Sequence, residues 1–187
     1  MKDDDQRFNA RLKLSKLDVA KRQLESAITL YFNGGDPVST HTLAAASLQI
    51  LQDLSKQRGD DTAFHNYELI KPEHRAEVRA AFRKAQNFFK HADDDAEETL
   101  DFNPEATAFY LLEAAETYMR LTAEKTAILR LFSLWFRAIW PEVFIFTEEE
   151  EQRISMVSSK FGITDKSKFF MMLLPAYTKI STLGIKS

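Results

Sequence analysis

The sequence predicts an all-α protein, a helical bundle of four to five core helices with a C-terminal helix pair. Apolar residues recur three and four positions apart in successive segments of the 187-residue chain, which is the spacing of an amphipathic helix. No stretch alternates polar and apolar residues as a half-buried strand would. Five glycines and five prolines are too few for the many tight turns of an all-β chain. We therefore expect a single helical domain over residues 1–187.

Capping residues delimit the first two helices. A regular apolar stripe predicts a helix over about 10–33, which the pair Gly34-Gly35 ends. The next helix begins at Asp36-Pro37, because aspartate caps a helix well and proline at the first helical position loses no hydrogen bond. We expect this second helix to run to about Arg58.

The same kind of signal marks the third and fourth helices. Pro72 opens a helix that we expect to run to about Ala92, where an acidic run over residues 93–101 begins. The pair Asn103-Pro104 then repeats the combination of cap and proline. It predicts a fourth helix over about 104–121.

The fifth predicted helix is apolar on nearly every side. We expect Thr122 to cap it and the helix to span about 123–140, before Pro141. Its polar positions form one narrow stripe of four residues: Thr126, Arg130, Ser133 and Arg137. Such a helix is buried on most sides, so it is either the central helix of the bundle or an oligomer interface.

The polar stripe of this fifth helix allows two interpretations. If the helix is central, the stripe's arginines need buried partners, for which the candidates are Glu113, Glu116 or a bound anion. If the helix lies at the surface, the stripe faces water.

Two further helices complete the C-terminal part. Thr147 and Glu150 have the spacing of a capping box and predict a sixth helix that ends near residue 160. The last helix begins two or three residues after Gly162. We expect Pro175 to kink or end it, because proline removes an internal hydrogen bond.

The third predicted helix carries a row of polar and cationic residues spaced by four: Arg75, Arg79, Arg83, Asn87 and His91. Lys90 lies beside Arg79 and Arg83 on the same side. Arginine pairs with phosphate oxygens through two parallel hydrogen bonds, and histidine exchanges protons near neutral pH. We therefore take Arg75, Arg79 and Lys90 as phosphate-binding candidates, and Arg83, Asn87 and His91 as catalytic candidates. The alternative is an ordinary solvated face whose arginines pair with nearby acids.

The segment Gln86-Asn87-Phe88-Phe89-Lys90-His91 resembles the signature of the HEPN family of helical bundles. That signature is an arginine, a polar residue such as asparagine, and a histidine one turn later. The resemblance implies a small, often dimeric bundle, either a metal-independent ribonuclease of bacterial defence systems or a non-catalytic binder of nucleotides or partners. Asn87 and His91 match the signature, Gln86 stands where the family has arginine, and Arg83 is the nearest substitute. Segments 36–43 and 87–93 also look like those of an uncharacterised bacterial all-helical family, a likeness that implies no activity.

A metal site is a competing hypothesis, because helical bundles hold metals between inward-facing carboxylates and histidines. The candidate ligands are His41, His91, Asp93, Glu113 and Glu116. The Glu-x-x-His pairing typical of such sites is absent, so we predict no metal and no cofactor. The alternative makes His41 a hydrogen-bonded core residue and pairs Glu116 with Arg120 across one helical turn.

Composition narrows the remaining choices. The chain lacks cysteine, which excludes disulfides and a cysteine nucleophile, and its net charge of −3 argues against polyanion binding by bulk charge. The acidic start Asp3-Asp4-Asp5 is unlike a signal peptide, and no apolar stretch reaches membrane-spanning length. We therefore expect a cytoplasmic protein that does not enter the membrane.

Two functional hypotheses follow. The first is a HEPN-like protein that binds RNA or a nucleotide phosphate along the third helix, with catalysis left open. The second is a non-catalytic homodimer that binds another protein, because 15 Phe, 2 Trp and 5 Tyr, together with the apolar fifth helix, supply more apolar surface than one small bundle needs.

Overall fold

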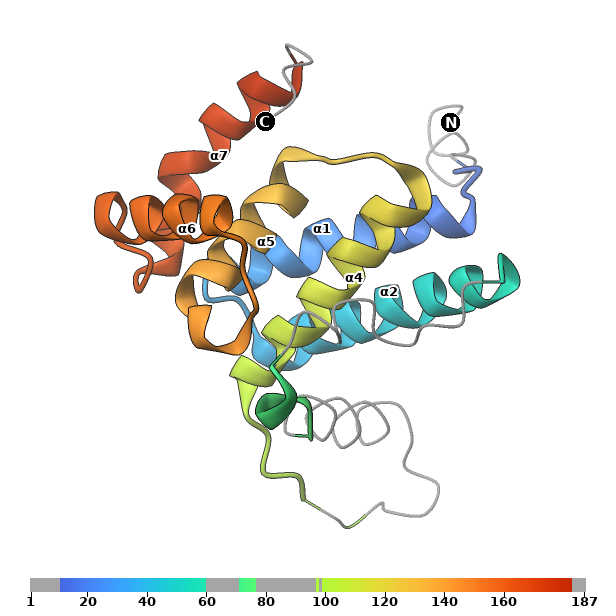
Figure 1. Ribbon diagram of the computed structural model, residues 1–187. Coiled ribbons are helices and arrows are strands. Elements are labelled where there is room, and N and C mark those ends of the chain that lie inside the picture. The colour runs from blue at the N-terminus through green and yellow to red at the C-terminus, as the bar shows by residue number, and fades with distance from the viewer. Residues whose placement is uncertain (1–10, 60–70, 77–96, 98, 183–187) are drawn as a thin grey trace, which may run out of the picture.

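The computed structural model describes residues 11–59, 71–76, 97 and 99–182. These residues form α-helices and short 3-10 helices, with no strand among them, which confirms the predicted all-α class (Figure 1). The α-helices are α1 (Lys16–Phe32), α2 (Pro37–Gln57), α4 (Thr107–Thr122), α5 (Ala127–Ile139), α6 (Glu148–Lys160) and α7 (Lys166–Thr182). The 3-10 helices are η1 (Pro72–His74), η2 (Pro104–Ala106) and η3 (Pro141–Val143).

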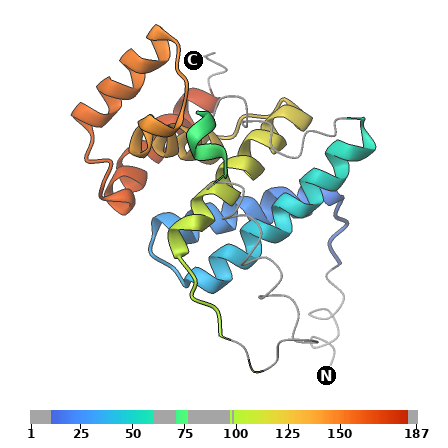
Figure 2. The same cartoon turned by 60° about the horizontal axis from the view of Figure 1, so that its bottom comes forward.

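The helices α1 and α2 form an antiparallel pair across which α4 lies (Figure 2). The backbone N–H of Ser39 donates to the Asp36 carboxylate over 2.7 Å, which confirms the predicted cap of α2. The helix α1 begins at Lys16 rather than near residue 10, because Ser15 and Asp18 form a capping box there. Asp18 was not recognised from the sequence as a partner in this cap.

The turn between α4 and α5 corrects one predicted boundary. Thr122 is the last residue of α4 and does not cap α5. Ala123 follows in the left-handed conformation with φ of 57°, and α5 begins four residues later, after Thr126. A left-handed alanine gives no glycine signal, so the sequence pattern did not reveal that the chain leaves the helix here.

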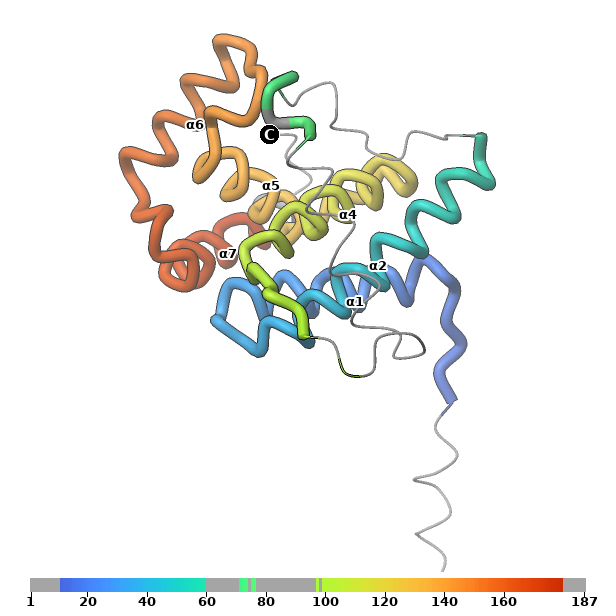
Figure 3. The backbone as a smooth tube through the Cα atoms, turned by 90° about the horizontal axis from the view of Figure 1, so that it is seen from below, coloured from blue at the N-terminus to red at the C-terminus, as the bar shows by residue number. Residues whose placement is uncertain are grey.

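The helix α5 is the central helix of the C-terminal half. It packs against α4 on one side and against α6 and α7 on the other, and it also contacts α1 (Figure 3). Phe132, Trp135 and Phe136 are buried and meet Phe32 of α1 in one aromatic cluster. The apolar surface of α5 is therefore covered within the chain. This favours the interpretation of α5 as the central helix of the bundle over that of an oligomer interface.

The C-terminal pair is close to the prediction. Thr147 and Glu150 form the expected capping box at the start of α6, and the Lys168 N–H donates to Asp165 before α7. Pro175 does not end α7, which continues to Thr182. Proline at this position deprives the carbonyl of Met171 of its partner, but Met171 is 66% exposed, so water is at hand for that carbonyl.

Candidate functional site

Most of the residues proposed for the third helix lie outside the described residues. These are Arg79, Arg83, Asn87, Lys90 and His91, which include all three catalytic candidates. Arg75 is described: it directly follows η1 and is half-buried. The cationic row and the HEPN-like segment therefore remain predictions.

Of the candidate metal ligands, His41 lies in the core and takes part in its packing. His41 is fully buried, with its Nδ1 3.0 Å from the hydroxyl of Thr107 and its ring against the edges of Phe102 and Tyr110. This agrees with the interpretation of His41 as a hydrogen-bonded core residue. Among the residues that the structure describes, no three His, Asp or Glu side chains are placed to hold a metal ion, while His91 and Asp93 fall outside them.

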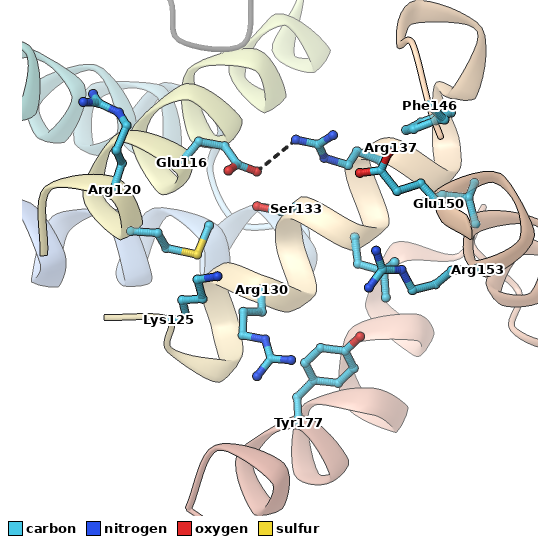
Figure 4. Close-up of a pocket in the computed structure, with 13 residues that line it drawn as sticks. Glu116, Arg120, Lys125, Arg130, Ser133, Arg137, Phe146, Glu150, Arg153 and Tyr177 are labelled. Atoms are coloured by element: carbon cyan, nitrogen blue, oxygen red, sulfur yellow. Dashed lines mark hydrogen bonds and ion pairs between the residues drawn. The ribbon is translucent and has the colours of Figure 1, made fainter. Parts of the chain in front are cut away.

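A cationic cavity lies elsewhere, between α4, α5, α6 and α7 (Figure 4). Its volume is about 460 Å³, which is within the range of small-molecule pockets. Of the described residues that line it, five are cationic and two are acidic; they are Arg120, Lys125, Arg130, Arg137, Arg153, Glu116 and Glu150. We call this cavity the cationic pocket.

The polar stripe predicted on α5 forms one wall of the cationic pocket. Arg130, Ser133 and Arg137 all line it, and the two arginines are half-buried. An Nη of Arg137 lies 3.3 Å from the carboxylate of Glu116 on α4, one of the partners predicted for it. The stripe thus faces a cavity that is open to solvent, and its two half-buried arginines lie in the cavity wall.

Arg130 points away from Arg137, towards α7. Its guanidinium carbon lies 5.6 Å from the centre of the Tyr177 ring, a cation–π distance (Figure 4). Burial raises the pKa of Tyr177, whereas the nearby charges of Arg130 and Arg153 lower it. Tyr177 thus packs against Arg130 and lines the cationic pocket together with Arg153 of α6.

The two carboxylates of the cationic pocket are already engaged. Glu116 accepts from Arg137, and Glu150 accepts from the backbone and hydroxyl of Thr147 in the α6 capping box. The bonds to Thr147 are the largest cause of the lowered pKa of Glu150, and the charges of Arg137 and Arg153 add to it. Glu150 is thus held ionised at neutral pH, mainly as part of the α6 cap.

Positive charge in the cationic pocket exceeds what these carboxylates balance. In the described part of the chain, no carboxylate lies within ion-pair distance of Lys125, Arg130 or Arg153. Lys125 and Arg153 are exposed at the rim, while Arg130 lies in the wall. Arg120 differs, because it donates to the hydroxyl of Ser55 on α2 over 3.1 Å. Among the described residues, these three cations have no carboxylate partner and are therefore available to an anion from solution.

Ser133 supplies an unsatisfied hydroxyl in the same wall. The residue is 8% exposed, and its oxygen has no hydrogen-bond partner among the described residues. Buried hydroxyls in proteins nearly always have a partner. Figure 4 places Ser133 between Arg130 and Arg137, at the centre of the pocket. A ligand with an acceptor atom there would satisfy it.

Sequence reasoning found the α5 wall and Glu116 as a partner for it, but not the other charged and aromatic residues of the pocket. Lys125, Arg153 and Tyr177 come from a loop and two other helices. Their only signal in the sequence is charge or aromaticity, which is common on helix surfaces.

None of the helices in the described residues is long and apolar enough to cross a membrane. Comparison of the chain with models of protein families, with curated proteins and with solved structures finds no match.

Proposed function

We propose that this protein binds a small phosphate-bearing anion in the cationic pocket. The observation that carries the proposal is the excess of positive charge: Lys125, Arg130 and Arg153 line one open cavity and have no described carboxylate partner. Bringing such cations together is unfavourable unless an anion joins them. The proposal keeps the ligand class expected from the sequence and assigns it to a different site.

The chemistry of the pocket lining is compatible with a phosphate group. Arg120 is bonded to Ser55, which leaves three other arginines around the cavity: Arg130, Arg137 and Arg153. Guanidinium groups hold phosphate oxygens through paired hydrogen bonds. The size of the cavity favours a small molecule over a nucleic acid strand, which needs an open, extended groove. RNA binding along the third helix stays a separate prediction.

The proposal is for binding rather than chemistry. The described residues that line the cationic pocket include no histidine or cysteine. Its two carboxylates are held by Arg137 and by the α6 cap, so neither is poised as a general base.

The alternative is a homodimeric interaction module, which we predicted from the aromatic content and from the apolar surface of the fifth helix. The second of these reasons no longer supports it. The apolar side chains of α5 are covered within the chain. Dimer formation and a protein partner stay predictions that rest on the aromatic content alone.

Isothermal titration calorimetry with pyrophosphate tests the proposed function. We expect saturable binding by the wild-type chain and a loss of roughly tenfold or more in affinity for Arg130→Gln, which removes a charge-assisted contact. The matched control is Arg22→Gln, which makes the same change at an exposed arginine on α1. Absence of binding, or equal weakening by both variants, would overturn the proposal.

A further inference from the structure

We propose that the ligand of the cationic pocket is a phosphate ester that also carries a hydroxyl group, as a glycerol or sugar phosphate does. This inference rests on the proposed function and names the chemical class of its ligand. Two residues that line the pocket carry it. Ser133 has a buried hydroxyl without a described partner, and the carboxylate of Glu116 can accept more hydrogen bonds than it receives.

The hydroxyl of Ser133 differs from those of the other buried serines in the described helices. Ser47 donates to the carbonyl of Ala20 over 3.0 Å, and Ser55 accepts from Arg120 over 3.1 Å. The oxygen of Ser133 is equally buried but has no hydrogen-bond partner among the described residues. An unpaired buried hydroxyl destabilises the fold. Ser133 therefore favours a bound molecule that pairs with it.

The carboxylate of Glu116 provides the second polar group. Its Oε1 lies 3.3 Å from an Nη of Arg137, and the described residues give it no second partner. A carboxylate can accept about four hydrogen bonds, two on each oxygen. The Glu116 side chain is 24% exposed and lines the cavity, so a donor on a bound molecule can reach it.

Ser133 and Glu116 meet in the same part of the cavity, although they come from different helices. Ser133 lies one turn before Arg137 on α5, so these two side chains project from one face of the helix. Arg137 in turn contacts Glu116 of α4. In Figure 4 the Ser133 oxygen lies on the side of α5 that faces the Glu116 carboxylate.

A hydroxyl group of the ligand can pair with both residues at once, because a hydroxyl is both a donor and an acceptor. Its oxygen accepts from the hydroxyl of Ser133, and its own O–H donates to the carboxylate of Glu116. A phosphate oxygen can satisfy Ser133 as well, but it places negative charge against Glu116. The lining therefore suits a ligand in which the phosphate meets the cations and a hydroxyl meets Ser133 and Glu116.

Calorimetry with two matched probes tests this inference. The first is glycerol phosphate esterified at a terminal carbon, and the second is propyl phosphate, which has the same charge and number of carbons but no hydroxyl. We expect glycerol phosphate to bind roughly tenfold more tightly to the wild-type chain, because it gains hydrogen bonds to Ser133 and Glu116. Ser133→Ala and Glu116→Ala should each reduce this ratio several-fold. The ratio is the readout because Glu116→Ala also frees Arg137 and so raises the affinity for both probes.

The matched control is Ser47→Ala, which makes the same change at a buried serine on α2, away from the pocket lining. It should keep the ratio. Urea denaturation without ligand compares the same two serines. Ser133→Ala should leave the midpoint unchanged or raise it, whereas Ser47→Ala should lower it by removing the bond to Ala20. An equal fall in both variants would mean that Ser133 is bonded within the protein, and the inference would be wrong.

The outcomes separate this inference from the proposed function. If glycerol phosphate binds the wild-type chain no more tightly than propyl phosphate, the inference is wrong and the anion pocket stands. The same holds if the ratio persists in either folded pocket variant. If neither ester binds but pyrophosphate does, the ligand is not a hydroxylated ester, and the anion pocket again stands. If pyrophosphate also fails to bind, the proposed function falls together with the inference.

Discussion

Two adjacent residues in the α4–α5 turn, Glu124 and Lys125, belong to polar clusters of opposite character. The carboxylate of Glu124 accepts from Lys21 of α1 and, over 2.5 Å, from the hydroxyl of Tyr118. We call these three residues the Glu124 cluster. Lys125 faces the cationic pocket and has no described ion-pair partner. One cluster is complete within the protein, whereas the other has charge left over.

The difference separates residues that stabilise the fold from residues available for binding. Hydrogen bonds from Lys21 and Tyr118 lower the pKa of Glu124, so its charged form is favoured by folding. In the pocket the charges repel one another, and an external anion is needed to balance them. Variants in the two clusters should therefore affect different measurements.

The largest effect is expected from removing two arginines of the pocket wall. The double variant Arg130→Gln/Arg137→Gln should lower the affinity for pyrophosphate by about 3 kcal/mol, because each charge-assisted hydrogen bond contributes roughly 1.5–3 kcal/mol. Calorimetry measures this change. The chain should stay folded, since relief of repulsion offsets the lost Glu116 contact. Retained affinity in a folded double variant would show that the pocket is not the binding site.

An intermediate effect is expected in the Glu124 cluster. Glu124→Gln removes the charge that Lys21 and Tyr118 both contact and should lower the free energy of unfolding by about 1 kcal/mol. Urea denaturation measures this loss, and the affinity for pyrophosphate should not change. A fall in anion affinity equal to that of the pocket variants would contradict the separation of the two clusters.

A smaller change of opposite sign is expected at Glu116. Glu116→Gln removes the internal carboxylate that competes with the ligand for Arg137, so anion affinity should rise several-fold, by somewhat less than 1.4 kcal/mol. The same calorimetric titration measures it. Weaker binding by this variant would mean that Glu116 helps to hold the ligand.

The smallest effect concerns pH. The folded state lowers the pKa of Glu124 from its ordinary value of 4.5, so the corresponding stability is present above that pH and is lost as pH falls through the lowered value. The difference in unfolding free energy between wild type and Glu124→Gln should therefore shrink below about pH 4.5. Denaturation series at several pH values would reveal a constant difference if the charge of Glu124 plays no part.

Local signals explain which parts of the fold the sequence predicted. The caps at Asp36 and Thr147 involve residues three positions apart, and both are present as expected. The boundary at Thr122 was wrong because Thr126, four residues later, is the N-cap residue and both threonines suit that role. Pro175 lies inside α7 because its exposed setting tolerates the lost hydrogen bond.

Only part of the cationic pocket could be predicted from the sequence, because its residues come from several helices. Helical periodicity placed Arg130, Ser133 and Arg137 on one stripe and suggested a carboxylate or an anion as their partner. That Arg153 and Tyr177 face the same stripe depends on how α6 and α7 pack against α5, which no local pattern encodes. The cationic row on the third helix was equally clear in the sequence, but most of it lies outside the described residues.

The most direct test follows the arginine side chains themselves during an anion titration. In a nuclear magnetic resonance titration with pyrophosphate, the Nε–Hε signals of Arg130, Arg137 and Arg153 should shift together and saturate, while that of Arg22 on α1 stays in place. Single arginine-to-glutamine variants assign the signals. Equal shifts at Arg22, or no shift at the three pocket arginines, would contradict the assignment of the cationic pocket as an anion-binding site.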